Sequence, residues 1–91
     1  MVKDAYGYEI TADSATQIEG LMCWNNNRMF SLIKDRYGIF WSGWDINRHY
    51  PVTWEYSADN LGSNQKEAKR LHKIEVDKLL ARIKEDPTKC W

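Results

Sequence analysis

The residues of this sequence best suited to chemistry lie in one short stretch, Trp44-Asp45-Ile46-Asn47-Arg48-His49-Tyr50-Pro51. An imidazole and a carboxylate close together can exchange protons with a substrate. Asp45, Arg48 and His49 form the only local concentration of such ionisable groups, and aromatic residues lie beside them. One histidine and one carboxylate in a connecting segment seldom make an active site, so we expect no catalytic residues here.

The same stretch fits recognition better than catalysis. Tryptophan, tyrosine and arginine dominate the binding energy of protein interfaces because they combine large contact areas with directional hydrogen bonds. The stretch contains all three residue types, and the residues we expect to contact a protein partner are Trp44, Asp45, Arg48, His49 and Tyr50. In the alternative interpretation, Trp44 and Tyr50 cover the core and their charged neighbours stay in solvent.

No other motif predicts a catalytic, metal or cofactor site. The sequence lacks a phosphate-binding glycine loop, a dinucleotide-binding glycine pattern, paired metal ligands and a serine nucleophile turn. The two cysteines, Cys23 and Cys90, have neither metal-site spacing nor the density of a disulfide scaffold. We therefore expect reduced thiols, and a protein that is not an enzyme and needs no cofactor.

A basic cluster later in the chain offers a different chemistry. Lys66, Lys69, Arg70 and Lys73 fall on about a quarter of a helix circumference, where they could contact phosphates or an acidic protein surface. The chain as a whole has 13 basic and 13 acidic residues, whereas dedicated nucleic-acid binders carry a clear basic excess. Nucleic-acid binding, RNA included, is therefore the second hypothesis.

The first two of these lysines lie in the segment Gly62-Ser63-Asn64-Gln65-Lys66-Glu67-Ala68-Lys69. This segment resembles the helix start of double-stranded RNA-binding domains, which also place a sheet before that helix. The resemblance implies phosphate contacts by Lys66, Lys69 and Arg70. It ends with this segment, because Leu71-His72-Lys73-Ile74 replaces the small residues of that family's helix, and only one strand separates His49 from the helix. Membership of the family does not follow.

Length and composition predict one small domain that spans residues 1–91. Hydrophobic residues make up 43% of the chain and charged residues 29%, with five tryptophans, five tyrosines and two phenylalanines to fill a core. No internal repeat is apparent. The start, Met1-Val2-Lys3-Asp4, lacks the apolar stretch of a signal peptide, and other apolar runs are short, so we expect a cytoplasmic protein that does not enter membranes.

Hydrophobic periodicity predicts an α+β fold: a short N-terminal strand, a helix, a three-stranded antiparallel meander and a long C-terminal helix packed on the sheet. The expected strands, set by alternation of apolar residues, are 6–10, 29–33, 39–46 and 52–56. Residues 35–38 should form a hairpin turn, Gly43 a bulge or a close backbone approach, and 58–63 a turn-rich link.

Capping residues predict the two helices. Ser14 and Gln17 have the spacing of a capping box before apolar residues at helical intervals, which predicts a helix over 14–25. Asn64 and Glu67 have the same spacing, and Asp86-Pro87 should end the second helix, which predicts a helix over 64–85.

The second helix has more apolar surface than one contact requires. The side expected to face the sheet contains Ala68, His72, Val76, Leu79, Leu80 and Ile83. We expect His72 to be a core or boundary residue rather than a ligand. Leu71 and Ile74 fall on another side, where they either contact the first helix or form an interface with a second copy or another protein.

These features favour a small non-catalytic protein-binding module that inhibits or adapts a larger partner. Small inhibitors encoded by phages or mobile elements often have this profile, with a surplus of aromatic residues and no catalytic motif. The identity of the partner does not follow from the sequence.

Overall fold

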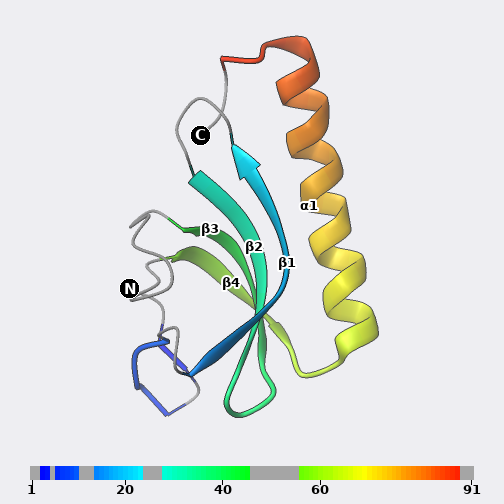
Figure 1. Ribbon diagram of the computed structural model, residues 1–91. Helices are drawn as coiled ribbons and strands as arrows, with labels where there is room; N and C mark the ends of the chain where they lie inside the picture. Colours follow the sequence, from blue (N-terminus) through cyan, green and yellow to red (C-terminus); the bar gives the residue numbers. More distant parts are fainter. Residues whose placement is uncertain (1–2, 5, 11–13, 24–27, 46–55, 89–91) are drawn as a thin grey trace.

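Four antiparallel strands followed by one long helix make up the described part of the chain (Figure 1). The computed structural model describes residues 3–4, 6–10, 14–23, 28–45 and 56–88, apart from the side chains at 56 and 57. The elements are β1 (Ala15–Cys23), β2 (Arg28–Asp35), β3 (Phe40–Asp45), β4 (Tyr56–Gly62) and α1 (Gln65–Glu85). The strands pair in chain order, and α1 packs on one face of the sheet. The fold is therefore α+β.

Helix α1 begins and ends where its capping residues predict. The side chain of Asn64 accepts hydrogen bonds from the backbone N–H groups of Lys66 (3.1 Å) and Glu67 (3.2 Å). At the other end, the N–H of Asp86 donates to the carbonyl of Arg82 at 3.0 Å, immediately before Pro87. These local bonds satisfy backbone groups that have no partner inside the helix.

The helix expected over 14–25 is wrong, because residues Ala15–Cys23 form strand β1. The pairing shifts between Gln17, opposite Ile33, and Glu19, opposite Leu32, so Ile18 is an extra residue in the strand. This bulge reverses the side to which alternate residues point. Apolar residues on either side of the bulge then recur at spacings that resemble a helix.

Gly20 allows this bulged strand to pack closely. The side chain of Gln17 lies over Gly20, and a Cβ atom there would collide with it. The Gln17 amide lies 2.9 Å from the sulfur of Met29 and 3.4 Å from the hydroxyl of Ser31, both on the neighbouring strand. The glycine that would weaken a helix thus leaves room in the strand for the Gln17 side chain.

The turn-rich link expected over 58–63 is also wrong, since residues up to Gly62 belong to β4. Ala58, Asp59 and Asn60 pair with β3 although these residue types are depleted in strands. Turn geometry is confined to the end of the strand, where the Asn60 side chain accepts from the N–H of Gly62 at 2.5 Å. The strand expected over 52–56 lies outside the described residues, except that Tyr56 begins β4.

The expected hairpin at 35–38 is confirmed between β2 and β3. The Asp35 N–H donates to the carbonyl of Ile39 at 2.9 Å, and the Gly38 N–H donates to the carbonyl of Asp35 at 3.1 Å. Gly43 is not at a bulge, because its pairing with Ser31 and Ala58 is in register with its neighbours.

A second turn, at residues 4–7, has the same pattern of hydrogen bonds as this hairpin. The sequence Asp-x-Tyr-Gly occurs at 4–7 and at 35–38. In each turn the aspartate Oδ1 accepts hydrogen bonds from the backbone N–H groups two and four residues later, and the glycine has a positive φ, 85° in one and 80° in the other. Residues 6–10 therefore form a turn and a single bridge between Lys3 and Glu9 instead of the expected strand.

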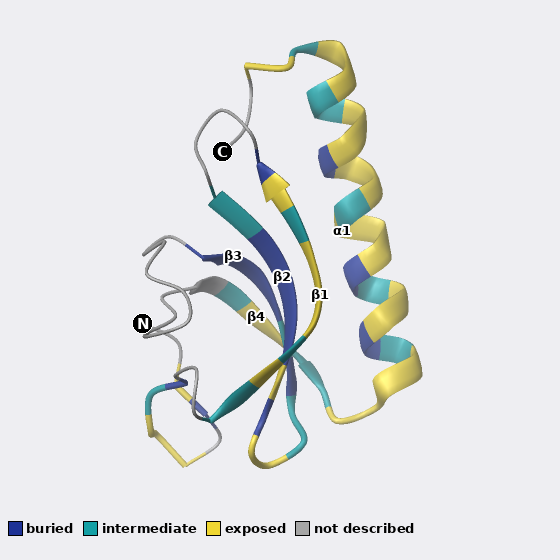
Figure 2. Ribbon diagram, in the orientation of Figure 1, coloured by how far each residue is buried: buried dark blue, intermediate teal, exposed yellow. Residues whose placement is uncertain are grey.

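Buried residues are concentrated in β2 and β3 and along one side of α1 (Figure 2), and apolar clusters lie on both faces of the sheet. On the face that α1 covers, the buried apolar residues are Cys23, Phe30, Leu32, Phe40, Trp44, Ala68 and Leu79. On the other face, Ile10 and Ile33 pack with Ala15, Trp41 and Ala58. The expected sheet-facing side of α1 is confirmed for its buried residues, but Leu80 is 46% exposed and does not belong to it. At 100° per residue, Leu80 lies about 80° around the helix from His72, the nearest buried residue of that side.

The expectation of reduced thiols is wrong for Cys23, which is disulfide-bonded. Cys23 is fully buried against Phe30, Trp44 and Leu79. The second cysteine of the chain, Cys90, lies outside the described residues. In the part of the chain that the structure describes, no helix combines the length and apolarity needed to cross a membrane.

Replacing Asp35 with alanine should destabilise the protein by about 2–4 kcal/mol, because three donors lose their acceptor. Asp35 is buried, and its carboxylate accepts from the N–H of Tyr37 (2.8 Å), the N–H of Ile39 (3.0 Å) and the indole of Trp41 (3.1 Å). Urea unfolding measures the change. Asp77→Ala, at an exposed position of α1, is the control; equal losses in both variants would contradict the turn's role.

Reduction of the Cys23 disulfide should lower the free energy of unfolding by about 2–4 kcal/mol, because the cross-link restricts the unfolded chain. Thermal melts with and without dithiothreitol measure the effect. The Cys23→Ala variant should melt identically in both buffers, and a wild-type protein that also ignores the reductant would show that the bond is unimportant.

Candidate functional site

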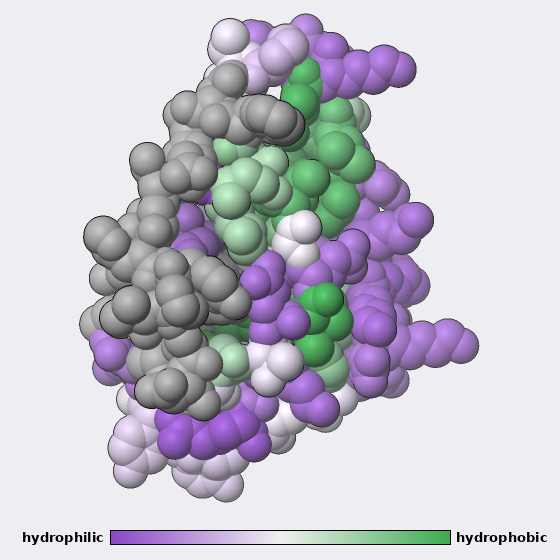
Figure 3. Space-filling view, in the orientation of Figure 1, coloured by the Kyte–Doolittle hydropathy of each residue, from purple (hydrophilic) through white to green (hydrophobic). Residues whose placement is uncertain are grey.

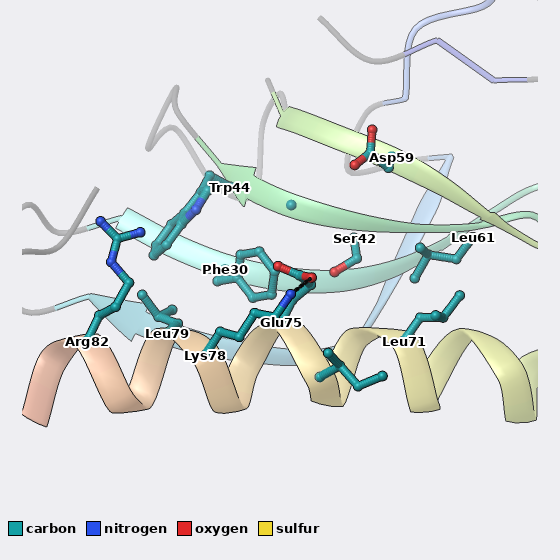
Figure 4. Close-up of a pocket in the computed structure, with 12 residues that line it drawn as sticks. Phe30, Ser42, Trp44, Asp59, Leu61, Leu71, Glu75, Lys78, Leu79 and Arg82 are labelled. Carbon is teal, nitrogen blue, oxygen red and sulfur yellow. Dashed lines mark hydrogen bonds and ion pairs between the residues drawn. The ribbon is translucent and has the colours of Figure 1, made fainter.

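A groove of about 540 Å³ lies between α1 and the last two strands of the sheet (Figure 4). Adjacent strands of a sheet rotate relative to one another. Near the start of α1, the end of β4 lies close to the helix, whereas the end of β3 and the start of β4 lie farther from it (Figure 1). The twist therefore leaves part of β3 and β4 uncovered by α1 within the described structure. The lining residues are Phe30, Ser42, Gly43, Trp44, Asp59, Leu61, Leu71, Ile74, Glu75, Lys78, Leu79 and Arg82.

Aromatic residues of the core form the floor of the groove. The rings of Phe30 and Trp44 meet edge to face, with centroids 5.2 Å apart. Trp44 is only 9% exposed, and the guanidinium of Arg28 lies 5.1 Å from its ring centroid. Of the two interpretations that the sequence left open for Trp44, the structure supports the core residue. One part of its ring nevertheless lines the groove.

Helix α1 supplies the wall of the groove. The residues expected to lie off the sheet-facing side, Leu71 and Ile74, both line it, the first half-buried and the second 40% exposed. Charged side chains follow along the same wall, where Glu75 and Lys78 form an ion pair at 3.4 Å and Arg82 lies farther toward Trp44. The groove therefore combines an apolar floor with a charged rim, as binding sites usually do.

The other residues of the expected recognition stretch do not join Trp44 there. Asp45 is the last residue of β3, is 3% exposed and, by strand alternation, lies on the opposite face from Trp44. Arg48, His49 and Tyr50 lie outside the described residues.

The basic cluster at the start of α1 is exposed, as expected for Lys66, Lys69, Arg70 and Lys73. Arg70 is not available as a simple cation, because its guanidinium is paired with the carboxylate of Glu67 one turn earlier. This pairing lowers the pKa of Glu67. The three lysines of the cluster lie on the exposed surface of α1, and none of them lines the groove described above.

His72 connects α1 to the middle of the sheet. Its ring is 1% exposed, stacks on Phe30 at 5.2 Å, and holds Nδ1 at 2.6 Å from the hydroxyl of Ser42. The other nitrogen, Nε2, has no hydrogen-bond partner among the described groups and lies 4.0 Å from a carboxylate oxygen of Glu19. A neutral ring with its proton on Nε2 would accept from Ser42 and point its N–H toward Glu19. The expectation of a core histidine is confirmed.

This series of serine, histidine and carboxylate resembles the grouping of serine hydrolases in residue types only. Ser42 lies in the middle of β3, which pairs with a strand on each side, so the nearby backbone N–H groups are used by the sheet instead of facing a substrate oxygen. Among the described residues, no three potential ligands gather as a metal site requires. The arrangement therefore supports a structural role.

Sequence reasoning missed an exposed tyrosine cluster at the two matched turns. Tyr6 and Tyr37 hold equivalent positions in the turns, and their rings lie 4.4 Å apart. The guanidinium of Arg36 lies 5.6 Å from the rings of both Tyr8 and Tyr37, and its Nε lies 3.4 Å from Asp4. The signal was present in the sequence as the repeated Asp-x-Tyr-Gly. The cluster attaches the N-terminal turn to the sheet.

A second apolar surface lies between the end of β1 and α1 (Figure 3). There Leu21, Val76 and Ile83 are half-buried, and Leu80, one turn after Val76, is exposed.

Comparisons with protein-family models, curated proteins and solved structures find no match to this chain.

The stability of the protein should fall as the pH drops below about 6.5, the usual pKa of histidine. Burial lowers the pKa of His72 in the folded state, although Glu19 acts in the opposite direction. The unfolded chain therefore binds the proton first, and stability is lost between the unfolded pKa and the lower folded pKa, at up to about 1.4 kcal/mol per pH unit. Urea unfolding at a series of pH values measures this slope. A His72→Gln variant should show a smaller slope; an unchanged slope would assign the effect to other groups.

Proposed function

We propose that this chain is a small non-catalytic module that binds a larger protein partner through the groove between α1 and β3–β4, and so inhibits or adapts that partner. The observation that supports this most directly is the convergence of Trp44, Leu71 and Ile74 on one cavity. Its volume of about 540 Å³ falls within the range of sites that enclose several side chains or a small molecule.

The groove has the composition of an interface rather than of a catalytic pocket. Apolar and aromatic side chains form its floor and part of its wall, and charged side chains of α1 share that wall, a mixture that is common in protein interfaces. Ile74 is a large apolar side chain that remains 40% exposed beside the cavity. Burying such a side chain against a partner would contribute about 1–2 kcal/mol.

Nucleic-acid binding through Lys66, Lys69, Arg70 and Lys73 is supported less well. The cluster lies on the exposed surface of α1, where Arg70 is already paired with Glu67, and the chain carries no net positive charge. Phosphate binding depends on an excess of free cations, and its affinity falls steeply with salt. Partner capture that resists both salt and nuclease treatment would therefore favour the groove.

The test is capture of partner proteins from a lysate of the source cell by tagged wild type and by two matched variants, Ile74→Glu and Leu80→Glu. The two positions lie on the same helix with similar exposure, 40% and 46%, but only Ile74 lines the groove. Ile74→Glu should weaken capture by about fivefold or more, because it places a charge at the apolar wall, and Leu80→Glu should not.

Circular dichroism and melting temperature confirm that both variants are folded, and size-exclusion chromatography with light scattering reports self-association through Leu71 and Ile74. Loss of capture in Leu80→Glu alone would place the interface on the surface between β1 and α1. Capture that disappears with nuclease in all three proteins would support the nucleic-acid hypothesis.

A further inference from the structure

Strand β1 forms one edge of the sheet. The strands pair in chain order, so within the described structure β1 pairs only with β2. Backbone N–H and C=O groups on the outer side of an edge strand have no partner in their own sheet, and a further extended strand can bind them. At nine residues, β1 is the longest of the four strands, and residues 19–23 pair with β2 without interruption. It is therefore long and regular enough to accept another strand.

The backbone of β1 is accessible near the middle of the strand. Gly20 is exposed, and because glycine has no side chain, this exposed surface belongs to the backbone. Ile18 and Met22, two residues before and after Gly20, are large apolar side chains that remain 38% and 45% exposed. A strand that pairs with β1 would remove apolar surface from water at these two positions as well as bind the backbone.

The protection that edge strands commonly carry is limited in β1. Lysine or proline on an edge strand hinders the addition of other strands, and Ala15–Cys23 contains neither. Its two protective features are the bulge at Ile18 and the charge of Glu19, whose side chain is 60% exposed. Both features precede Gly20, so the part of β1 that follows has no charge and no bulge.

The opposite edge of the sheet, β4, is better protected. Its sequence, Tyr56–Gly62, includes a serine, an aspartate and an asparagine. Leu61 is an extra residue in the pairing with β3, and the Asn60 side chain accepts a hydrogen bond from the N–H of Gly62. A bulge and a used backbone donor both hinder strand addition. Sheet extension is therefore expected at β1 and not at β4.

A second copy of the chain is the occupant that best fits this edge. Its own β1 is already extended and held by β2, so it pairs without the ordering cost that a flexible segment incurs. Charge selects the direction of the pair. In an aligned parallel pair the two Glu19 carboxylates would lie side by side, whereas an antiparallel pair centred on Gly20 places Glu19 opposite Leu21 of the second copy.

We propose that two copies of the chain associate by antiparallel pairing of their β1 strands about Gly20, which joins two four-stranded sheets into one continuous sheet. Each copy offers the same edge, so the contact is symmetric, and the protected β4 edges end the assembly at the dimer. The groove has no lining residue from β1, so the dimer keeps both grooves open and the inference does not depend on the proposed function.

Light scattering after size-exclusion chromatography, over a series of protein concentrations, tests the dimer with the full chain. The mass of the wild type should rise from 10.8 kDa toward twice that value. Met22→Glu should raise the dissociation constant of the dimer by about tenfold or more, because it places a carboxylate at the strand junction, near Glu19 of the second copy. Ile18→Glu should act in the same way and provides a second variant if either one fails to fold.

The matched control is Ile74→Glu, which makes the same change at a similarly exposed apolar residue of α1 that lines the groove. It should change the dissociation constant of the dimer by less than about twofold, because it lies outside the strand junction. Capture of the protein partner should respond in the opposite way, with a loss in Ile74→Glu and none in Met22→Glu.

Hydrogen exchange identifies the edge that pairs. Backbone amides of β1 should exchange more slowly at concentrations where the dimer forms, and those of β4 should exchange at the same rate in monomer and dimer. A wild type that remains monomeric at about 1 mM, which corresponds to a binding free energy weaker than about −4 kcal/mol, would overturn the proposal. So would a dimer that Ile74→Glu dissociates, or one that folded Met22→Glu and Ile18→Glu leave intact. None of these results decides whether the groove captures a partner, so the two proposals fail separately.

Discussion

A twisted sheet of four strands carries one helix on its face, and the twist leaves part of β3 and β4 uncovered by that helix. Because α1 must follow directly from Gly62, its first turns lie against the end of β4. The twist then carries β3 and β4 away from its later turns. The groove is the consequence, and its floor is part of the core. No separate binding loop is needed among the described residues to make a cavity.

Polar contacts inside the core determine how α1 lies on the sheet. Apolar side chains alone tolerate small shifts, whereas the bond between Ser42 and His72 requires one register of helix and strand. Asp35 has the same role at the hairpin between β2 and β3, where its carboxylate serves two backbone groups and an indole. Since α1 forms the wall of the groove, the shape of the groove depends on the buried His72.

Local signals predicted the elements that depend on local bonds. The caps of α1 and the turn at Asp35 were readable because all their partners lie within a few residues. Strand β1 was not, since the bulge at Ile18 breaks the alternation that identifies strands, and β4 was hidden by polar residues that pair only because β3 lies beside them. The groove could not be predicted for a similar reason. Trp44 was expected to contact a partner and Leu71 was noticed as excess apolar surface of the helix, but only the three-dimensional sheet brings them to one cavity.

The floor of this groove belongs to the core of the protein, whereas its wall is formed by α1. Phe30 and Trp44 both pack in the buried cluster that contains Cys23, so a change at either one alters the fold and the surface together. Ile74, on the helix, is 40% exposed and lies outside that cluster, so it can vary with less effect on folding. A change at Ile74 would therefore alter the wall of the groove and leave the core in place. Specificity would then depend on exposed positions of α1, where no catalytic or metal-binding motif would be visible in the sequence.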